Sequence, residues 1–192
     1  MKRLTLLAGI AAAIAAAAIP ANAADYVFDI KGQHASIGFR VKHLGYSWLT
    51  GRFDKFDGTF SYDPASPAAS KVSVEIETAS ISSNHAERDK HLRGPDYLDS
   101  ETYPKATFVS TQVIPDGENK AKIKGNFTLH GVTKEIVLEM ERVGGGPDPW
   151  GGERMGFSGT AKLTIADFGF KKQLGPASKE VELFLDVEGI QE

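Results

Sequence analysis

The sequence predicts an all-β protein, an extended antiparallel β-barrel of about eight strands with one short helical insert. Apolar and polar residues alternate along most of the chain, which is the pattern of strands that bury one face. Turn residues separate these runs, and strands do not alternate with helices. The strands run to about ten residues, so a sheet of so many long strands must close or split into two layers. Because closure removes exposed edges, we expect a barrel rather than a sandwich.

The N-terminus has the pattern of a secretory signal peptide. Met1-Lys2-Arg3 is a charged start, residues 4–19 are apolar, and residues 20–23 offer an Ala-x-Ala cleavage site. The apolar run is short for a membrane span, which needs about 20 residues, although a retained N-terminal anchor is the alternative. We therefore expect a cleaved signal peptide over residues 1–23, no permanent membrane anchor, and a single domain over residues 24–192.

The composition excludes several classes of function. The 192 residues contain no cysteine, which excludes a lipoprotein anchor, disulfides, iron–sulfur clusters, cysteine-based zinc sites and thiolate catalysis. The net charge is −3, and removal of Lys2 and Arg3 with the signal peptide makes the rest more acidic. A chain without a basic field is not expected to bind nucleic acid. No hydrolase, phosphate-loop or zinc-protease motif occurs, so we do not expect an enzyme.

Four alternating runs precede the helical insert, at residues 25–31, 36–42, 56–62 and 71–77. Residues 43–51 are rich in glycine and aromatic residues, and we expect them to link the second run to the third. Asp63 to Pro67 has the composition of a turn.

The insert, Ser82 to Phe108, differs from the rest of the chain because it is polar and has no alternation. Asn84 is expected to cap a short helix, with Glu87 at the capping-box spacing. Gly94, in a left-handed conformation, and then Pro95 are expected to end the helix. We expect this insert at one end of the barrel, where a ligand enters.

Five further runs follow the insert, at residues 106–113, 121–129, 135–141, 155–165 and 180–187. Residues 115–117 and 130–131 are expected to turn the chain. Gly144 to Gly152 contains five glycines and two prolines, so we expect a long flexible connection there.

One apolar face of these strands must point into the barrel. The inward candidates are Phe28, Phe39, Phe60, Val74, Phe108, Phe127, Leu138, Phe157, Leu163 and Leu183. Three glycines, Gly58, Gly125 and Gly159, share that face and indicate either bends needed for closure or unfilled space. The barrel is therefore either packed with side chains or open as an apolar tunnel. A tunnel would favour a long hydrocarbon, since each buried CH₂ contributes about 0.8 kcal/mol.

The other face carries many charges, among them Lys71, Glu75, Lys122 and Glu182. Strands of an outer-membrane barrel are apolar outside and polar inside. So many charges do not fit a lumen that is eight strands wide, so we expect the charged face to meet water.

Several motifs, in order along the chain, resemble the YceI family. They are Gly32-Gln33-His34, residues 39–48 (Phe-Arg-Val-Lys-His-Leu-Gly-Tyr-Ser-Trp), residues 84–93 (Asn-His-Ala-Glu-Arg-Asp-Lys-His-Leu-Arg), residues 103–108, 129–134, 148–152 and 174–178. The resemblance implies a secreted periplasmic protein with a lipocalin-like barrel that binds isoprenoid lipids, such as polyprenyl chains or quinone-like molecules, in its lumen. It is compatible with a homodimer, and it supplies no catalytic residues. The expected lipid-binding residues are then Phe28, Phe39, Phe60, Phe108, Phe127, Leu138, Phe157, Leu163 and Leu183.

The polar helix has three interpretations. As a mouth, His85, Arg88, Lys90 and Arg93, with Trp48 nearby, would attract the head group of a lipid whose tail enters the barrel. As a metal site, His85 and Asp89 would share one helix face. As an ordinary surface helix, its charges would form ion pairs. Trp48 and Trp150 lie in glycine-rich connections and would either plug the barrel ends or contact a ligand or a membrane surface.

Three functions follow from these alternatives. The first is a periplasmic carrier that holds an isoprenoid-type lipid, with no cofactor and no metal. The second is an enzyme that acts on such a lipid through His85, Asp89 and Ser82 or Ser83. The third is a structural or stress protein with a filled barrel.

Overall fold

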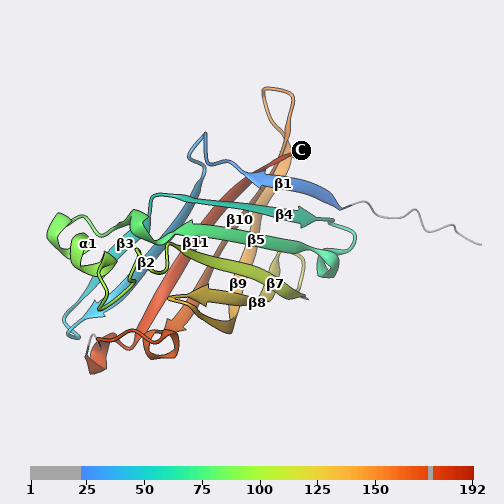
Figure 1. The fold of residues 1–192 in the computed structure, drawn as a ribbon. Helices are drawn as coiled ribbons and strands as arrows, with labels where there is room; N and C mark the ends of the chain where they lie inside the picture. The colour runs from blue at the N-terminus through green and yellow to red at the C-terminus, as the bar shows by residue number, and fades with distance from the viewer. Residues whose placement is uncertain (1–22, 173–174) are drawn as a thin grey trace, which may run out of the picture.

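The computed structural model describes residues 23–172 and 175–192 (Figure 1). All but the last residue of the expected signal peptide, residues 1–22, lie outside the described residues. The described residues form a closed antiparallel barrel with one α-helix, which confirms the predicted fold class. The elements are β1 (Ala24–Phe28), β2 (Ala35–His43), β3 (Ser47–Phe53), β4 (Phe56–Tyr62), β5 (Lys71–Glu77), β6 (Ile81–Ser82), α1 (Ala86–Arg93), β7 (Lys105–Asp116), β8 (Lys120–Leu129), β9 (Val132–Pro147), β10 (Glu153–Thr164) and β11 (Glu180–Gln191), with 3₁₀ turns at Pro67–Ala69, Thr78–Ser80, Ile165–Phe168 and Pro176–Ser178.

The sheet closes through the order β1-β4-β5-β7-β8-β9-β10-β11, after which β11 returns to β1. At the other end of the barrel, β2, β3 and β6 continue the directions of β1, β4 and β5, because β2 pairs with β3 and β3 with β6. The result is three long, bent strands, formed by β1 with β2, by β4 with β3, and by β5 with β6. This explains why eleven strands make an eight-stranded barrel.

The last strand, β11, completes the barrel. It pairs along its length with β10, and on its other side with β2, from Val181↔Val41 to Val187↔Ala35. Its final residues pair with β1, from Phe28↔Gly189 to Tyr26↔Gln191. The C-terminus consequently lies beside β1 (Figure 1), where the Glu192 N–H donates to the Asp25 carbonyl.

The alternation of the strands sorts their side chains as predicted. Ile37 and Phe39 of β2 are buried inside, at 4% and 8% exposure. Charged residues on the outer face pair across strands, as with Lys105 Nζ and Glu75 Oε1 at 2.6 Å and Lys122 Nζ and Glu139 Oε1 at 3.5 Å. Such exposed pairs add little stability, about 0–1 kcal/mol each, so burial of the apolar face supports the fold.

Two expected connections are shorter than predicted, because strand pairing outweighs the loop preference of glycine. Within 43–51, β3 already begins at Ser47 and pairs with β2. Gly51 fits in this strand because the ring of Phe39 covers it, and a Cβ there would lie 2.4 Å from the ring Cζ. Within 144–152, β9 continues to Pro147 and pairs with β10, so only residues 148–152 form the turn.

The helix forms as expected, but its ends differ from the prediction. Asn84 adopts the left-handed conformation, with φ of 62°, which asparagine tolerates better than most residues. His85 is therefore the N-cap, and its Nδ1 accepts the Arg88 backbone N–H at 3.2 Å. Gly94 is extended, not left-handed, so the predicted C-terminal motif is wrong.

Candidate functional site

The barrel contains two cavities whose linings share residues near its middle. One, of about 150 Å³, reaches the β7–β8 turn at Gly117 to Asn119, and we call it the turn chamber. The other, of about 330 Å³, reaches α1 at Arg88 to Leu92, and we call it the helix chamber. Four residues line both chambers and form a waist between them: Ile37, Ile76, Phe127 and Leu183.

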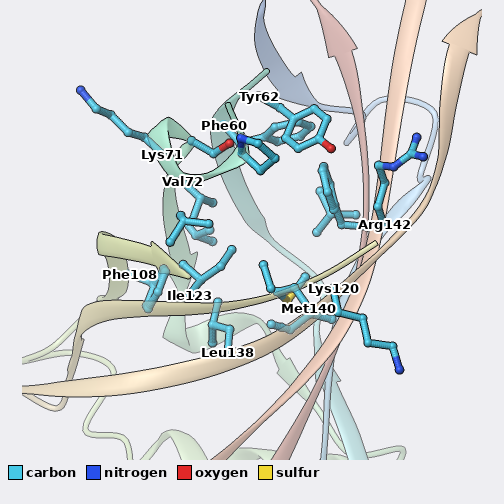
Figure 2. Close-up of a pocket in the computed structure, with 18 of the residues that line it drawn as sticks. Phe60, Tyr62, Lys71, Val72, Phe108, Lys120, Ile123, Leu138, Met140 and Arg142 are labelled. Atoms are coloured by element: carbon cyan, nitrogen blue, oxygen red, sulfur yellow. The ribbon is translucent and has the colours of Figure 1, made fainter. Parts of the chain in front are cut away.

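All nine expected lipid-binding residues, and Val74 as the tenth inward candidate, line these chambers. Phe28, Phe60, Phe108, Leu138 and Phe157 line the turn chamber, Phe39 and Leu163 line the helix chamber, and Phe127 and Leu183 line both. Figure 2 shows the turn chamber, where Val72, Ile123, Leu138 and Met140 point inward while the amino groups of Lys71 and Lys120 point away. The lumen is therefore apolar inside and polar at its rim.

Two of the three inward glycines, Gly58 and Gly125, are covered by aromatic rings, and the third, Gly159, is covered by the side chain of Met140. A Cβ on Gly58 would lie 2.6 Å from Cε2 of Phe28, and one on Gly125 would lie 2.3 Å from Cζ of Phe108. Because a side chain is missing at these positions, each ring packs against the barrel wall. Volume in the turn chamber is thus left open.

The chemistry of the chambers favours an apolar occupant. A cavity of about 150 Å³ lined by Leu, Ile and Phe is large enough to hold a molecule such as benzene and stays dry when empty. A polar group moved into such a lining would lose its hydrogen bonds to water without replacement. A hydrocarbon gains about 0.8 kcal/mol for each CH₂ buried.

Of the five residues predicted at the mouth, only Arg88 lines a chamber within the part of the chain that the structure describes. His85 caps the helix, and Lys90 is exposed. Arg93 donates through Nη1 to the carbonyls of Ala79 and Ile81, both at 3.3 Å, so it holds the insert on the barrel. Trp48 lies on the outer face, with the Arg40 guanidinium 4.3 Å from its ring centroid.

Other residues form the mouth of the helix chamber, and sequence reasoning missed them. They are Lys42, His43, Leu44, His91, Tyr97 and Ser178. Lys42, His43 and Leu44 had been assigned to the end of a strand and to a link, and nothing in the spacing of Tyr97 or Ser178 brings them to this end. The ring of His91 meets that of Tyr97 edge-on at a centroid distance of 5.1 Å.

A buried polar network fixes the start of α1. The carboxylate of Asp89 accepts from the backbone N–H of Ser83 at 2.8 Å and from its hydroxyl, and Arg88 Nε donates to the same hydroxyl at 2.7 Å. Burial opposes the charge of Asp89, but the hydrogen bonds from Ser83 and the charges of Arg93 and Arg88 outweigh it, so its pKa lies below the usual range. Ser83 and Asp89 thus hold the helix in place, and His85 directs its Nδ1 to the helix backbone rather than to Ser83.

A second network locks the β9–β10 turn to the β1–β2 loop. Arg154 donates to Asp29 Oδ2 at 2.6 Å, to Asp148 Oδ2 at 2.9 Å and to Glu188. The hydrogen bonds from Arg154 and His34 lower the pKa of the Asp29 carboxyl to about 2. Asp29, His34 and Glu188 lie close enough together to ligate a cation, but the Arg154 guanidinium already serves as the positive partner of both carboxylates.

A model of the YceI-like domain matches residues 28–189. The chain is also 54% identical over 193 residues to a UPF0312 protein of Vibrio cholerae, with 100% of both chains covered. The chain belongs to the YceI family.

Solved structures share the YceI fold. The YceI protein of Campylobacter jejuni is 31% identical, with a TM-score of 0.71 over 79% of this chain and 90% of that one. A polyisoprenoid binding domain from Saccharophagus degradans is 16% identical, with a TM-score of 0.63 over 89% of this chain and 100% of that one, and this similarity concerns the fold alone. In the described part of this YceI-like chain, no helix is long and apolar enough to span a membrane.

Proposed function

We propose that this protein is a periplasmic carrier that holds an isoprenoid-type lipid, a polyprenyl chain or a quinone-like molecule, in its barrel. The observation that supports the proposal is the pair of apolar chambers on either side of the waist, whose four residues line both of them. A long unbranched or repeating hydrocarbon can lie in both chambers at once, and the polar head then remains at one rim. The name of the Saccharophagus domain, a protein of the same fold, agrees with this ligand class.

The periplasmic location depends on residues 1–23 acting as a cleaved signal peptide. Charged start, apolar stretch and Ala-x-Ala end are all present in that segment. N-terminal sequencing of protein from the periplasmic fraction tests this, and an N-terminus at Ala24 is the expected result. A protein from this fraction that still begins at Met1 would contradict it.

Native mass spectrometry after gentle purification tests the carrier function. The expected result is a co-purifying lipid of a few hundred daltons or more. Titration with isoprenoid alcohols of increasing length should then raise the affinity by at least about tenfold per added isoprene unit until both chambers are filled. If the protein takes up no apolar probe, the structural role with a filled barrel is favoured instead. If the protein converts the lipid chemically and His85→Ala abolishes this conversion, the enzyme is favoured.

A further inference from the structure

The tip of the β2–β3 hairpin carries an apolar side chain where the backbone disfavours one. Leu44 and Gly45 are its two central residues, with φ of 52° and 85°, and the Tyr46 N–H donates to the His43 carbonyl at 2.9 Å. These values define a type I′ turn, whose first central position favours Asn, Asp or Gly because φ is positive. A leucine there is strained, and it is also 60% exposed. Turn geometry does not account for a leucine at this position.

Two aromatic residues extend the apolar surface of this tip. Tyr46 is 87% exposed and Trp48 is 43% exposed. Tyr and Trp combine an apolar ring with one polar group, which suits the boundary between lipid and water. We call Leu44, Tyr46 and Trp48 the hairpin tip.

Two lysines flank the hairpin tip. Lys42 is exposed and holds its amino group 5.5 Å from the Trp48 ring centroid. The Ser178 hydroxyl donates to the Lys42 carbonyl, so the exposed Lys179 lies in the segment packed beside it. Glu180 follows at the start of β11, so one acidic residue accompanies the two lysines. Long cationic side chains of this kind can reach lipid phosphates while their stems cover apolar surface.

The hairpin tip also stands at the opening of the lumen. Lys42, His43 and Leu44 line the helix chamber, so Leu44 contacts the cavity and solvent together. An apolar chain that passes from a bilayer directly into this mouth would avoid contact with water. The free-energy cost of such contact rises in proportion to the length of the chain.

We propose that the hairpin tip docks on the surface of a lipid bilayer, with Leu44, Tyr46 and Trp48 in the interfacial layer and Lys42 and Lys179 at the phosphates. Docking of the tip is independent of what fills the lumen. Its role in loading lipid through the helix chamber rests on the proposed carrier function.

The chain supplies a matched control at its other end. Trp150 is 78% exposed in the β9–β10 turn. The start of β11 pairs on one side with the end of β10, at Thr164↔Glu180, and on the other side with the end of β2, at Val181↔Val41. The hairpin tip therefore lies near the end of β10, whereas Trp150 precedes its start. Trp48 and Trp150 are the two tryptophans of the chain, so each can be followed by fluorescence in the absence of the other.

Co-sedimentation with vesicles of phosphatidylcholine and phosphatidylglycerol in a 7:3 ratio tests the docking. Leu44→Asn combined with Tyr46→Ser should lower the partition coefficient at least tenfold, and Asn-Gly suits the turn, so the variant should fold. Trp150→Ala should partition like the unchanged protein. In Trp150→Phe, the emission of Trp48 should shift to the blue when vesicles are added.

Each other outcome overturns the proposal. If the Leu44→Asn, Tyr46→Ser variant and the unchanged protein have equal partition coefficients, the hairpin tip does not contact the membrane. A concentration-dependent dimer in sedimentation equilibrium that this variant abolishes, without vesicle binding, would make the tip an interface between copies of the chain. Uptake of farnesol by Tyr46→Ser, measured without vesicles, should be unchanged, so a failure of docking is separable from a failure of the carrier function.

Discussion

The ring of Phe108 occupies the space in which a side chain on Gly125 would begin. An ideal Cβ on Gly125 would lie 2.3 Å from Cζ of Phe108 and 2.7 Å from the carbonyl oxygen of Val109. The two residues lie on neighbouring strands, β7 and β8, and they act as one unit of the barrel wall. The absence of a side chain at Gly125 therefore sets the position of an aromatic ring at the edge of the turn chamber.

Gly125→Ala should push the Phe108 ring into the turn chamber. We expect a loss of about 1–3 kcal/mol in the free energy of unfolding, as for overpacking of a core, together with weaker uptake of apolar probes. Urea denaturation and probe titration measure the two effects. Gly144→Ala in β9 is the control, because a Cβ there meets nothing within 4 Å. An equal loss of stability in both variants would show that any alanine in place of a strand glycine destabilises the barrel, and that the contact with Phe108 is not the cause.

Leu138→Trp should fill the turn chamber. Leu138 is 8% exposed and faces the lumen, whereas its neighbour Val137 is 38% exposed on the outer face. We expect Leu138→Trp to lower the affinity for a long isoprenoid alcohol by at least about tenfold, since the hydrocarbon then loses two or more buried CH₂ groups. Val137→Trp adds the same ring outside and should bind normally. Isothermal titration calorimetry makes the comparison, and unchanged binding by Leu138→Trp would place the lipid elsewhere.

Phe127→Leu should widen the waist between the two chambers. The smaller side chain lowers stability by a few kcal/mol at most, because part of a buried ring is removed. The affinity for chains long enough to reach both chambers should rise relative to that for short chains. Phe184→Leu is a suitable control, since Phe184 lies on the outer face with the Arg40 guanidinium 4.9 Å from its ring centroid. If short and long chains respond alike, the ligand does not pass the waist.

Acid should weaken the network around Arg154. The pKa of Asp29 falls from its ordinary 3.8 to about 2 in the folded protein, so the folded state favours the carboxylate. The resulting stability is fully present above the ordinary pKa and is lost as the pH falls through 3.8 towards 2. Asp29→Asn should cost about 1.5–3 kcal/mol at pH 7, as for other hydrogen bonds to charged groups, and should flatten the pH dependence in that window.

Urea denaturation between pH 2 and pH 7 measures this dependence. Asp25→Asn, in β1 near Asp29 but exposed, is the control and should leave the curve unchanged. A curve of Asp29→Asn that keeps the slope of the unchanged protein would assign the acid sensitivity to other carboxylates.

Alternation along the chain predicted the strands, because a closed sheet with one buried side imposes a period of two on every strand. Strand length favoured a closed barrel, and the charges on one face indicated that the other face points inward. The ten inward candidates follow from that parity together with the charges on the opposite face. The same logic failed at Gly51 and at Gly144 to Pro147, where local glycine content indicated a loop and the neighbouring strand supplied the pairing.

The mouth was harder to predict, because it is assembled from separate parts of the chain. Arg93 and Arg88 look alike in the sequence, yet Arg93 binds two backbone carbonyls and Arg88 lines the helix chamber. Lys42 and Ser178 come together only because β11 brings the 3₁₀ turn at Pro176–Ser178 beside β2. Contacts between residues so distant in sequence leave no local pattern.

Closure by β11 depends on contacts between residues far apart in the sequence. Arg40 and Glu182 pair across β2 and β11 although they are 142 residues apart. Until the last strand has emerged, β1 and β2 present an open edge able to join another nascent chain. Contacts of such long range form slowly, so the chain is exposed to aggregation while the barrel is still open.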